Sequence, residues 1–161
     1  MSSSGRPRCQ LSARVLTEEQ IKVYMTGSET ETRQLAETLA KQFVPGQVVC
    51  LRGDLGVGKT VFAKGLCSAL GVVEHVSSPT FTLVNEYEGI NGTIYHFDLY
   101  RIEDPDELYE VGFEDFVGGG GVAIIEWPER AEEMLPRKRL EILLERHGEN
   151  GRRITVKELF E

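Results

Sequence analysis

Apolar and polar residues alternate in the first periodic stretch of the chain and then change to a helical spacing. Ile21–Thr26 alternates and is rich in β-forming residues, which predicts a strand. A Gly-Ser pair follows, and Ser28 with Glu31 forms a capping box that predicts the start of a helix. The apolar stripe of this helix consists of Leu35, Ala36, Leu39, Ala40 and Phe43. Pro-Gly at 45–46 ends the helix, and the apolar residues 48–51 predict a strand buried on both faces of a parallel sheet.

The rest of the chain continues this alternation of strand and helix signals. A second helix follows residues 53–60 and runs to about Leu70, and residues 103–109 predict a short acidic helix. Further strands are predicted at 80–88 and 93–99 around an Asn-Gly turn, at the apolar segment 122–125, and in a closing hairpin of 140–146 with 153–157. Strands that alternate with helices indicate an α/β layered domain with antiparallel additions.

Length and composition fit one globular domain. The chain has 161 residues, of which 40% are hydrophobic and 27% charged. Residues 1–20 lack periodicity and are expected to form a flexible N-terminal tail, which leaves 21–161 as the single folded domain. No apolar run approaches the roughly 20 residues of a transmembrane helix, and the three cysteines have no C-x-x-C spacing. We therefore expect a soluble protein of the reducing cytoplasm, without a membrane segment.

The net charge of -8 is concentrated in one part of the sequence. Between Asn85 and Phe116 there are ten acidic residues and one basic residue, Arg101, and the remaining residues sum to +1. A nucleic-acid binder needs a Lys/Arg patch to neutralise phosphates, so direct binding of RNA or DNA is not expected. The acidic stretch is either a solvated face or an anionic docking surface for a partner.

Residues 53–60 carry the most specific chemical signal of the chain. They match G-x-x-x-x-G-K-[ST], the phosphate-binding loop, between an apolar strand and a striped helix. Glycines let the backbone N–H groups curl around phosphate oxygens, and a helix N-terminus adds about half a positive charge. Lys59 would bridge the β- and γ-phosphates, and the Thr60 hydroxyl would bind Mg²⁺. The expected nucleotide-binding residues are Gly53, Asp54, Leu55, Gly56, Val57, Gly58, Lys59, Thr60 and Val61. The alternative is a glycine-rich turn that binds no ligand.

Two acidic residues each follow an apolar strand, as a nucleotide site requires. Asp98 ends the strand that contains residues 94–97, and Glu126 ends 122–125. Near Mg²⁺ they would divide into one metal-side ligand and one water-positioning group, without the sequence deciding which is which. Either could instead be a surface residue at a strand end.

Three further features are less specific. Ser77–Thr80 is either a switch whose hydroxyl senses the γ-phosphate or a plain polar turn. The histidines at 75, 96 and 147 share no metal-ligand spacing and are interpreted as packing or surface residues. Trp127, the only tryptophan, directly follows Glu126; it is expected to pack there and to report on the site.

Four motifs, in this order, make the chain resemble the TsaE family, formerly called YjeE, over about residues 21–157. They are Gly-Asp-Leu-Gly-Val-Gly-Lys-Thr at 53–60, Ser-Pro-Thr-Phe-Thr-Leu-Val-Asn-Glu-Tyr at 78–87, His-Phe-Asp-Leu-Tyr-Arg at 96–101 and Ile-Glu-Trp-Pro-Glu-Arg at 125–130. The family consists of small bacterial P-loop ATPases needed to make threonylcarbamoyladenosine in tRNA. The resemblance implies a P-loop NTPase-like three-layer sandwich with a mixed, mainly parallel central sheet.

The resemblance also implies a mechanism and partners. It implies a Mg²⁺-dependent ATPase that binds ATP and ADP and whose activity is weak in the absence of partners. It also implies that the protein acts with TsaB and TsaD to support multiple turnovers. The acidic stretch would be available for docking on these partners. The implied roles are phosphate binding by Lys59, metal binding by Thr60 and Glu126, hydrolysis for Asp98, a switch at Thr80, and enclosure of the base by Glu29 and Arg153.

Two other classes of function are alternatives to the interpretation as a partner-dependent ATPase. Small P-loop kinases begin with the same strand, loop and helix, but they usually close an arginine-bearing lid over the phosphates. The central stretch here holds Arg101 as its only basic residue, which disfavours a kinase. A nucleotide sensor that assembles a complex on binding ATP, without required hydrolysis, stays open.

Overall fold

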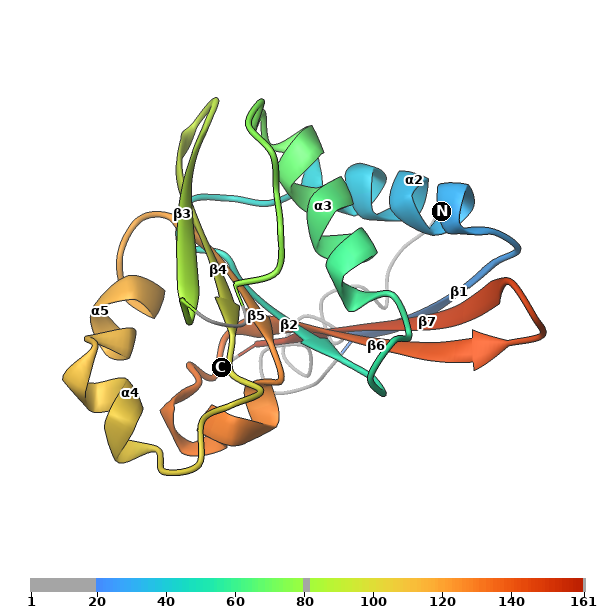
Figure 1. The fold of residues 1–161 in the computed structure, drawn as a ribbon. Helices are drawn as coiled ribbons and strands as arrows, with labels where there is room; N and C mark the ends of the chain where they lie inside the picture. The colour runs from blue at the N-terminus through green and yellow to red at the C-terminus, as the bar shows by residue number, and fades with distance from the viewer. Residues whose placement is uncertain (1–19, 80–81, 161) are drawn as a thin grey trace, which may run out of the picture.

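Seven strands form one sheet in the computed structural model, which describes residues 20–79 and 82–160 (Figure 1). The strand order is β1-β7-β6-β2-β5-β4-β3. The strands are β1 (Gln20–Thr26), β2 (Val48–Arg52), β3 (Val84–Gly89), β4 (Gly92–Asp98), β5 (Val122–Glu126), β6 (Arg139–His147) and β7 (Gly151–Leu159). The predicted N-terminal tail lies outside the described residues, except for Gln20, which begins β1.

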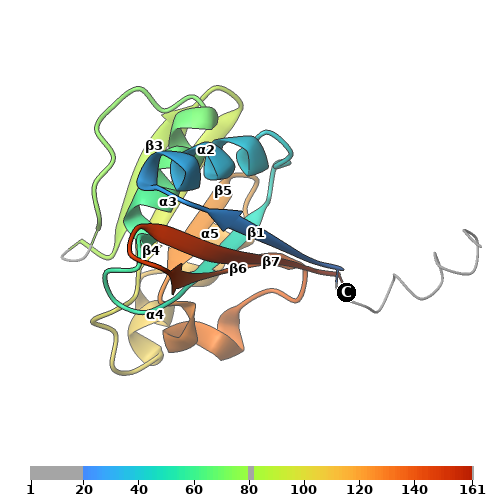
Figure 2. The same cartoon turned by 90° about the vertical axis from the view of Figure 1, so that its right-hand side faces the viewer.

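The centre of the sheet is parallel and both edges are antiparallel. β2 pairs in parallel with β5 and with β6, and β4 pairs in parallel with β5. The hairpin of β6 and β7 continues antiparallel into β1, and β3 pairs antiparallel with β4 (Figure 2). The predicted α/β fold with a mixed, mainly parallel sheet and antiparallel additions is confirmed.

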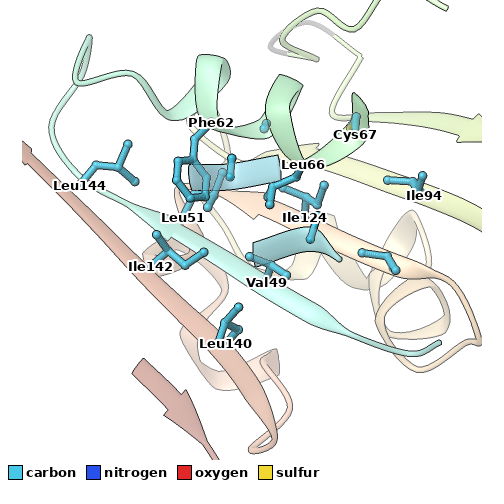
Figure 3. Packing of buried hydrophobic residues seen from close by; sticks show 14 of the residues in the cluster. Val49, Leu51, Phe62, Leu66, Cys67, Ile94, Ile124, Leu140, Ile142 and Leu144 are labelled. Atoms are coloured by element: carbon cyan, nitrogen blue, oxygen red, sulfur yellow. The ribbon is translucent and has the colours of Figure 1, made fainter. Parts of the chain in front are cut away.

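Helices cover both faces of the sheet (Figure 1). One face carries α2 (Glu29–Ala40) and α3 (Lys59–Ala69), and the other carries α4 (Asp106–Glu110), α5 (Phe113–Val117) and the 3₁₀ segment η1 (Pro128–Met134). Because side chains alternate along a strand, Val49, Leu51 and Ile124 pack with Phe62 and Leu66 of α3 (Figure 3). Their neighbours on the strands, such as Cys50 and Ile125, join the core on the opposite face.

Local sequence signals explain most element ends. Ser28 adopts the extended N-cap conformation of α2 and accepts a hydrogen bond from the Glu31 backbone N–H at 3.1 Å, so the predicted helix start is confirmed. The acidic helix α4 begins at Asp106, after Pro105, which is later than predicted. β3 begins at Val84 because Leu83, with φ of 74°, lies in the left-handed region.

Two elements had no sequence prediction. α5 has five residues, between Gly112 and Gly118, and η1 has seven. Both are too short to present a helical period of apolar residues. No helix in the described ranges is long and apolar enough to cross a membrane.

Candidate functional site

Residues 53–58 form a tight loop between the buried strand β2 and the helix α3. Gly53 has φ of 147°, and a Cβ atom there would lie 2.6 Å from the Leu144 carbonyl oxygen, so only glycine fits. Gly58, with φ of 110°, caps α3, and no side chain of residues 20–79 and 82–160 forms a capping hydrogen bond at the start of this helix. Such free N–H groups and the helix dipole favour an anion at this position.

Lys59 is buried at the start of α3, with 5% of its surface exposed. Its Nζ donates to the Gly53 carbonyl oxygen at 2.5 Å and lies 3.6 Å from the centre of the Trp127 ring. Burial lowers the pKa of the Lys59 ammonium, and the negative charges of Glu126, Glu129, Asp98 and Asp54 partly offset this effect. The Lys59 ammonium is therefore held by a backbone carbonyl and an aromatic ring, and a phosphate oxygen can replace these contacts.

Trp127 adopts a backbone conformation that is rare for a bulky residue. Its φ of 60° lies in the left-handed region, directly after Glu126 at the end of β5. Its ring packs on Tyr100 at 5.0 Å between centroids, joins the hydrophobic cluster on that face of the sheet, and also contacts the Lys59 cation. Strained conformations of this kind concentrate at functional sites. The predicted packing of Trp127 beside the site is confirmed, whereas its contact with Lys59 was not predicted.

The two predicted carboxylates lie side by side at the ends of parallel strands. Asp98 and Glu126 are direct partners in the β4–β5 register, and both are buried, at 6% and 3% exposed. Asp98 accepts from the Ser78 hydroxyl through Oδ2 and from the Tyr100 backbone N–H through Oδ1, both at 3.0 Å. These two contacts fix the orientation of the Asp98 carboxylate.

The segment expected to act as a switch lies beside Asp98. Ser78 belongs to it and contacts Asp98 through its hydroxyl, whereas Thr80 lies outside the described residues. Thr60 is the second residue of α3 and is half-buried.

His96 contacts Glu126, which the sequence did not predict. The Nε2 atom of His96 lies 2.7 Å from Oε2 of Glu126, and His96 is fully buried. The histidines were predicted to be packing or surface residues, and the structure buries His96 and exposes His75 and His147. The signal that could have found the contact is the spacing of His96 and Asp98, which places both on one face of β4.

A pocket of about 290 Å³ adjoins the loop and the start of α2. It is lined by Gly27, Ser28, Glu29, Thr32, Val57, Gly58, Val61, Glu149, Asn150 and Arg152. The predicted Glu29 is therefore present at the pocket, and the β6–β7 hairpin contributes Arg152. Arg153 is exposed and does not line the pocket, because consecutive residues of β7 point to opposite faces.

Two arginines of the β6–β7 hairpin donate hydrogen bonds to backbone carbonyls of the phosphate-binding loop. Arg152 Nε donates to the Val57 carbonyl oxygen at 2.7 Å, and Arg146 donates to the Gly56 carbonyl oxygen at 3.2 Å. Both arginines bind carbonyl oxygens of the loop and not its N–H groups. Neither contact was predicted, since both join residues distant along the chain.

A cluster of charged residues anchors the end of β2, directly before the loop in the sequence. Arg52 donates to Glu141 of β6 and to Glu132, and Arg139 also donates to Glu141. Burial raises the pKa of the Glu141 carboxyl, but the hydrogen bonds and charges of the two arginines outweigh it, so that the net pKa lies below its ordinary value. Because Arg52 directly precedes Gly53, this cluster holds the stem of the loop.

Comparison with known proteins gives a consistent result. The sequence matches the family TsaE, described as "Threonylcarbamoyl adenosine biosynthesis protein TsaE", over residues 26–154. The tRNA threonylcarbamoyladenosine biosynthesis protein TsaE of Bacillus subtilis (strain 168) is 42% identical over 132 residues, which cover 82% of each chain. The protein of that name from Aquifex aeolicus (strain VF5) is 42% identical over 140 residues, 86% of this chain and 97% of that one. The crystal structure of Bacillus subtilis YdiB superposes with a TM-score of 0.76 at 35% identity and covers 88% of each chain.

Proposed function

The chain belongs to the TsaE family of threonylcarbamoyl adenosine biosynthesis proteins, and on this premise we propose that it binds and hydrolyses ATP during the biosynthesis of threonylcarbamoyladenosine in tRNA. The observation that carries this proposal is that two buried carboxylates, Asp98 and Glu126, lie side by side and close enough to Lys59 of the phosphate-binding loop for their charges to act on it. We expect it to act in the cytoplasm, where tRNA is modified.

The loop has the chemistry to hold the phosphates and Mg²⁺. Free N–H groups at the start of α3 would bind phosphate oxygens, and Lys59 would exchange the Gly53 carbonyl for a phosphate oxygen. The Thr60 hydroxyl and the Glu126 carboxylate would hold Mg²⁺, which supplies charge neutralisation at the phosphates when it is bound. Hard oxygen donors of this kind fit the preference of Mg²⁺.

Asp98 is the residue proposed to orient the attacking water. Its carboxylate is fixed by Ser78 and Tyr100 and lies next to Glu126, so one carboxylate can serve the metal and the other the water. Ser78 links Asp98 to the segment that contains Thr80, which would allow this segment to respond to the γ-phosphate.

The base would occupy the pocket beside the loop. Glu29 of α2 and Arg152 of β7 both line it, and Arg152 also donates a hydrogen bond to the Val57 carbonyl oxygen of the loop. A nucleotide in this pocket would thus contact the loop, α2 and the β6–β7 hairpin together.

TsaB and TsaD are the proposed partners, and ATP hydrolysis by this chain would support repeated turnovers of that pair. The surface available to them includes the exposed acidic residues of α4, among them Glu107 and Glu110. This surface belongs to the segment that connects β4, which ends at Asp98, to β5, which ends at Glu126, so that docking there would act on a segment joined to both carboxylates.

An Asp98→Asn variant tests whether hydrolysis is required. We expect it to bind ATP as the unchanged protein does, but to support no more than about one round of tRNA modification per TsaD, because general acid–base catalysis contributes on the order of 10²- to 10⁴-fold in rate. Modified tRNA is counted per TsaD over time. Repeated rounds at the normal rate would instead favour an ATP sensor without required hydrolysis.

A further inference from the structure

Within the part of the chain that the structure describes, the side chain of His96 makes one polar contact. It is fully buried on β4, and its Nε2 lies 2.7 Å from Oε2 of Glu126. Its other ring nitrogen, Nδ1, is the one buried side-chain nitrogen or oxygen atom of residues 20–79 and 82–160 that has no hydrogen-bond partner.

This arrangement selects one form of the imidazole ring. A proton on Nε2 provides a donor to the Glu126 carboxylate and leaves Nδ1 as a bare acceptor. Any form with a proton on Nδ1 would bury an N–H group without an acceptor, which costs on the order of 1–3 kcal/mol. The geometry therefore favours the tautomer in which His96 donates from Nε2 to Glu126.

This contact gives the two oxygens of the Glu126 carboxylate different surroundings. Oε2 is occupied by His96, whereas Oε1 has no partner in the described part of the chain and is not fully buried. The carboxylate lies close enough to Lys59 for its charge to act on that ammonium. One oxygen is thus held by a buried side chain, and the other is not fully buried.

We propose that His96 is a positioning residue that holds the Glu126 carboxylate with its free oxygen directed toward Mg²⁺ bound with the nucleotide. The proposal rests on the proposed function. Hydrogen-bond partners that orient a metal ligand typically contribute about 10- to 100-fold in metal affinity. Removal of the His96 donor should have an effect of this size on Mg²⁺ and not on the nucleotide itself.

The test compares His96→Leu, which removes the donor, with His96→Gln, whose amide can still donate to Glu126. A non-hydrolysable ATP analogue is titrated by calorimetry in EDTA and at increasing Mg²⁺. We expect the affinity in EDTA to stay within about 2-fold of the unchanged protein for both variants. The Mg²⁺ concentration at half-maximal effect should rise by about 10-fold or more in His96→Leu and by less than about 3-fold in His96→Gln.

Two controls separate positioning from packing. Ile94→Val alters another buried residue on the same face of β4 and should leave the Mg²⁺ midpoint unchanged. If His96→Leu does not fold, His96→Asn replaces it, because its shorter side chain cannot reach Glu126 and the same defect is expected.

Other outcomes would contradict either the role of His96 alone or the proposed function as well. An unchanged Mg²⁺ midpoint in His96→Leu, or a defect in His96→Gln as large as in His96→Leu, would overturn the role of His96 while the proposed function stands. An unchanged protein that binds the analogue with no dependence on Mg²⁺ would overturn the proposed function, and the role of His96 with it.

Discussion

The Lys59 ammonium lies 3.6 Å from the centre of the Trp127 ring and donates at the same time to the Gly53 carbonyl oxygen. The cation of the phosphate-binding loop therefore contacts the residue that directly follows the β5 carboxylate. A cation at this distance from an indole face is stabilised by the charge distribution of the ring, by about 0.5–2 kcal/mol. Binding of phosphate must compete with this contact.

Trp127 emission should therefore report on nucleotide binding. When the Lys59 ammonium moves to a phosphate oxygen, the indole loses its cation, and we expect the emission of Trp127 to change in intensity or wavelength on addition of a non-hydrolysable ATP analogue. The signal belongs to one residue, because the chain has one tryptophan. Lys59→Ala lacks the cation and should show little change at the same analogue concentration. Equal changes in both proteins would exclude this origin of the signal.

Arg152 and Arg153 form a matched pair for testing the base pocket. Arg152 lines the pocket and donates to the Val57 carbonyl, whereas its neighbour is exposed and lies away from it. We expect Arg152→Ala to weaken ADP binding by roughly 10- to 100-fold, since a charged hydrogen bond contributes roughly 1.5–3 kcal/mol, and Arg153→Ala to leave it unchanged. Calorimetry of both variants checks this. A larger loss in Arg153→Ala would show that the base lies elsewhere.

Glu141 should stabilise the fold at neutral pH and lose this effect in acid. Its Gln variant leaves Arg52 and Arg139 without their shared carboxylate, and we expect a loss of about 2 kcal/mol, or roughly 4–8 °C in Tm. The pKa of Glu141 is lowered in the folded state, so its contribution is complete above the ordinary value of about 4.3 and is lost as the pH falls through the lower folded value.

Thermal melts from pH 7 down to pH 3 check this prediction. The difference in Tm between the unchanged protein and Glu141→Gln should shrink on acidification. Glu145→Gln is the matched control, because Glu145 lies on the same face of β6 but is exposed, and it should change Tm by less than about 1 °C. A constant difference at every pH would contradict the proposed charge effect.

The acidic surface of α4 should contribute to docking on TsaB and TsaD. We expect reversal of Glu107 and Glu110 to lysine to weaken association with the pair in a pull-down at low salt, where charge interactions are least screened. Glu107 also accepts from the Asp104 backbone N–H at 3.2 Å, so Glu110→Lys alone is the cleaner variant. Glu74→Lys, an exposed reversal at another place, is the control. Unchanged association of the α4 variants would remove this surface from the interface.

Patterns within short stretches predicted most of the fold, and contacts between distant stretches could not be predicted. The loop, both carboxylates and the closing hairpin follow from local spacing. Whether Arg152 or Arg153 faces the pocket depends on the phase of β7 against its neighbours, which period-two alternation alone does not set. The contact of His96 with Glu126 likewise requires β4 to lie beside β5, and that order is a property of the whole sheet.

The most direct test of whether this chain is a partner-stimulated ATPase is its ATP turnover, measured with and without Mg²⁺ and with and without its cognate TsaB–TsaD pair. Lys59→Ala serves as the blank, because it removes the buried cation of the loop. We predict Mg²⁺-dependent turnover that is slow alone, rises markedly when the pair is added and is absent in Lys59→Ala. Turnover that ignores the pair, or that persists in Lys59→Ala, would contradict a partner-stimulated ATPase at this site.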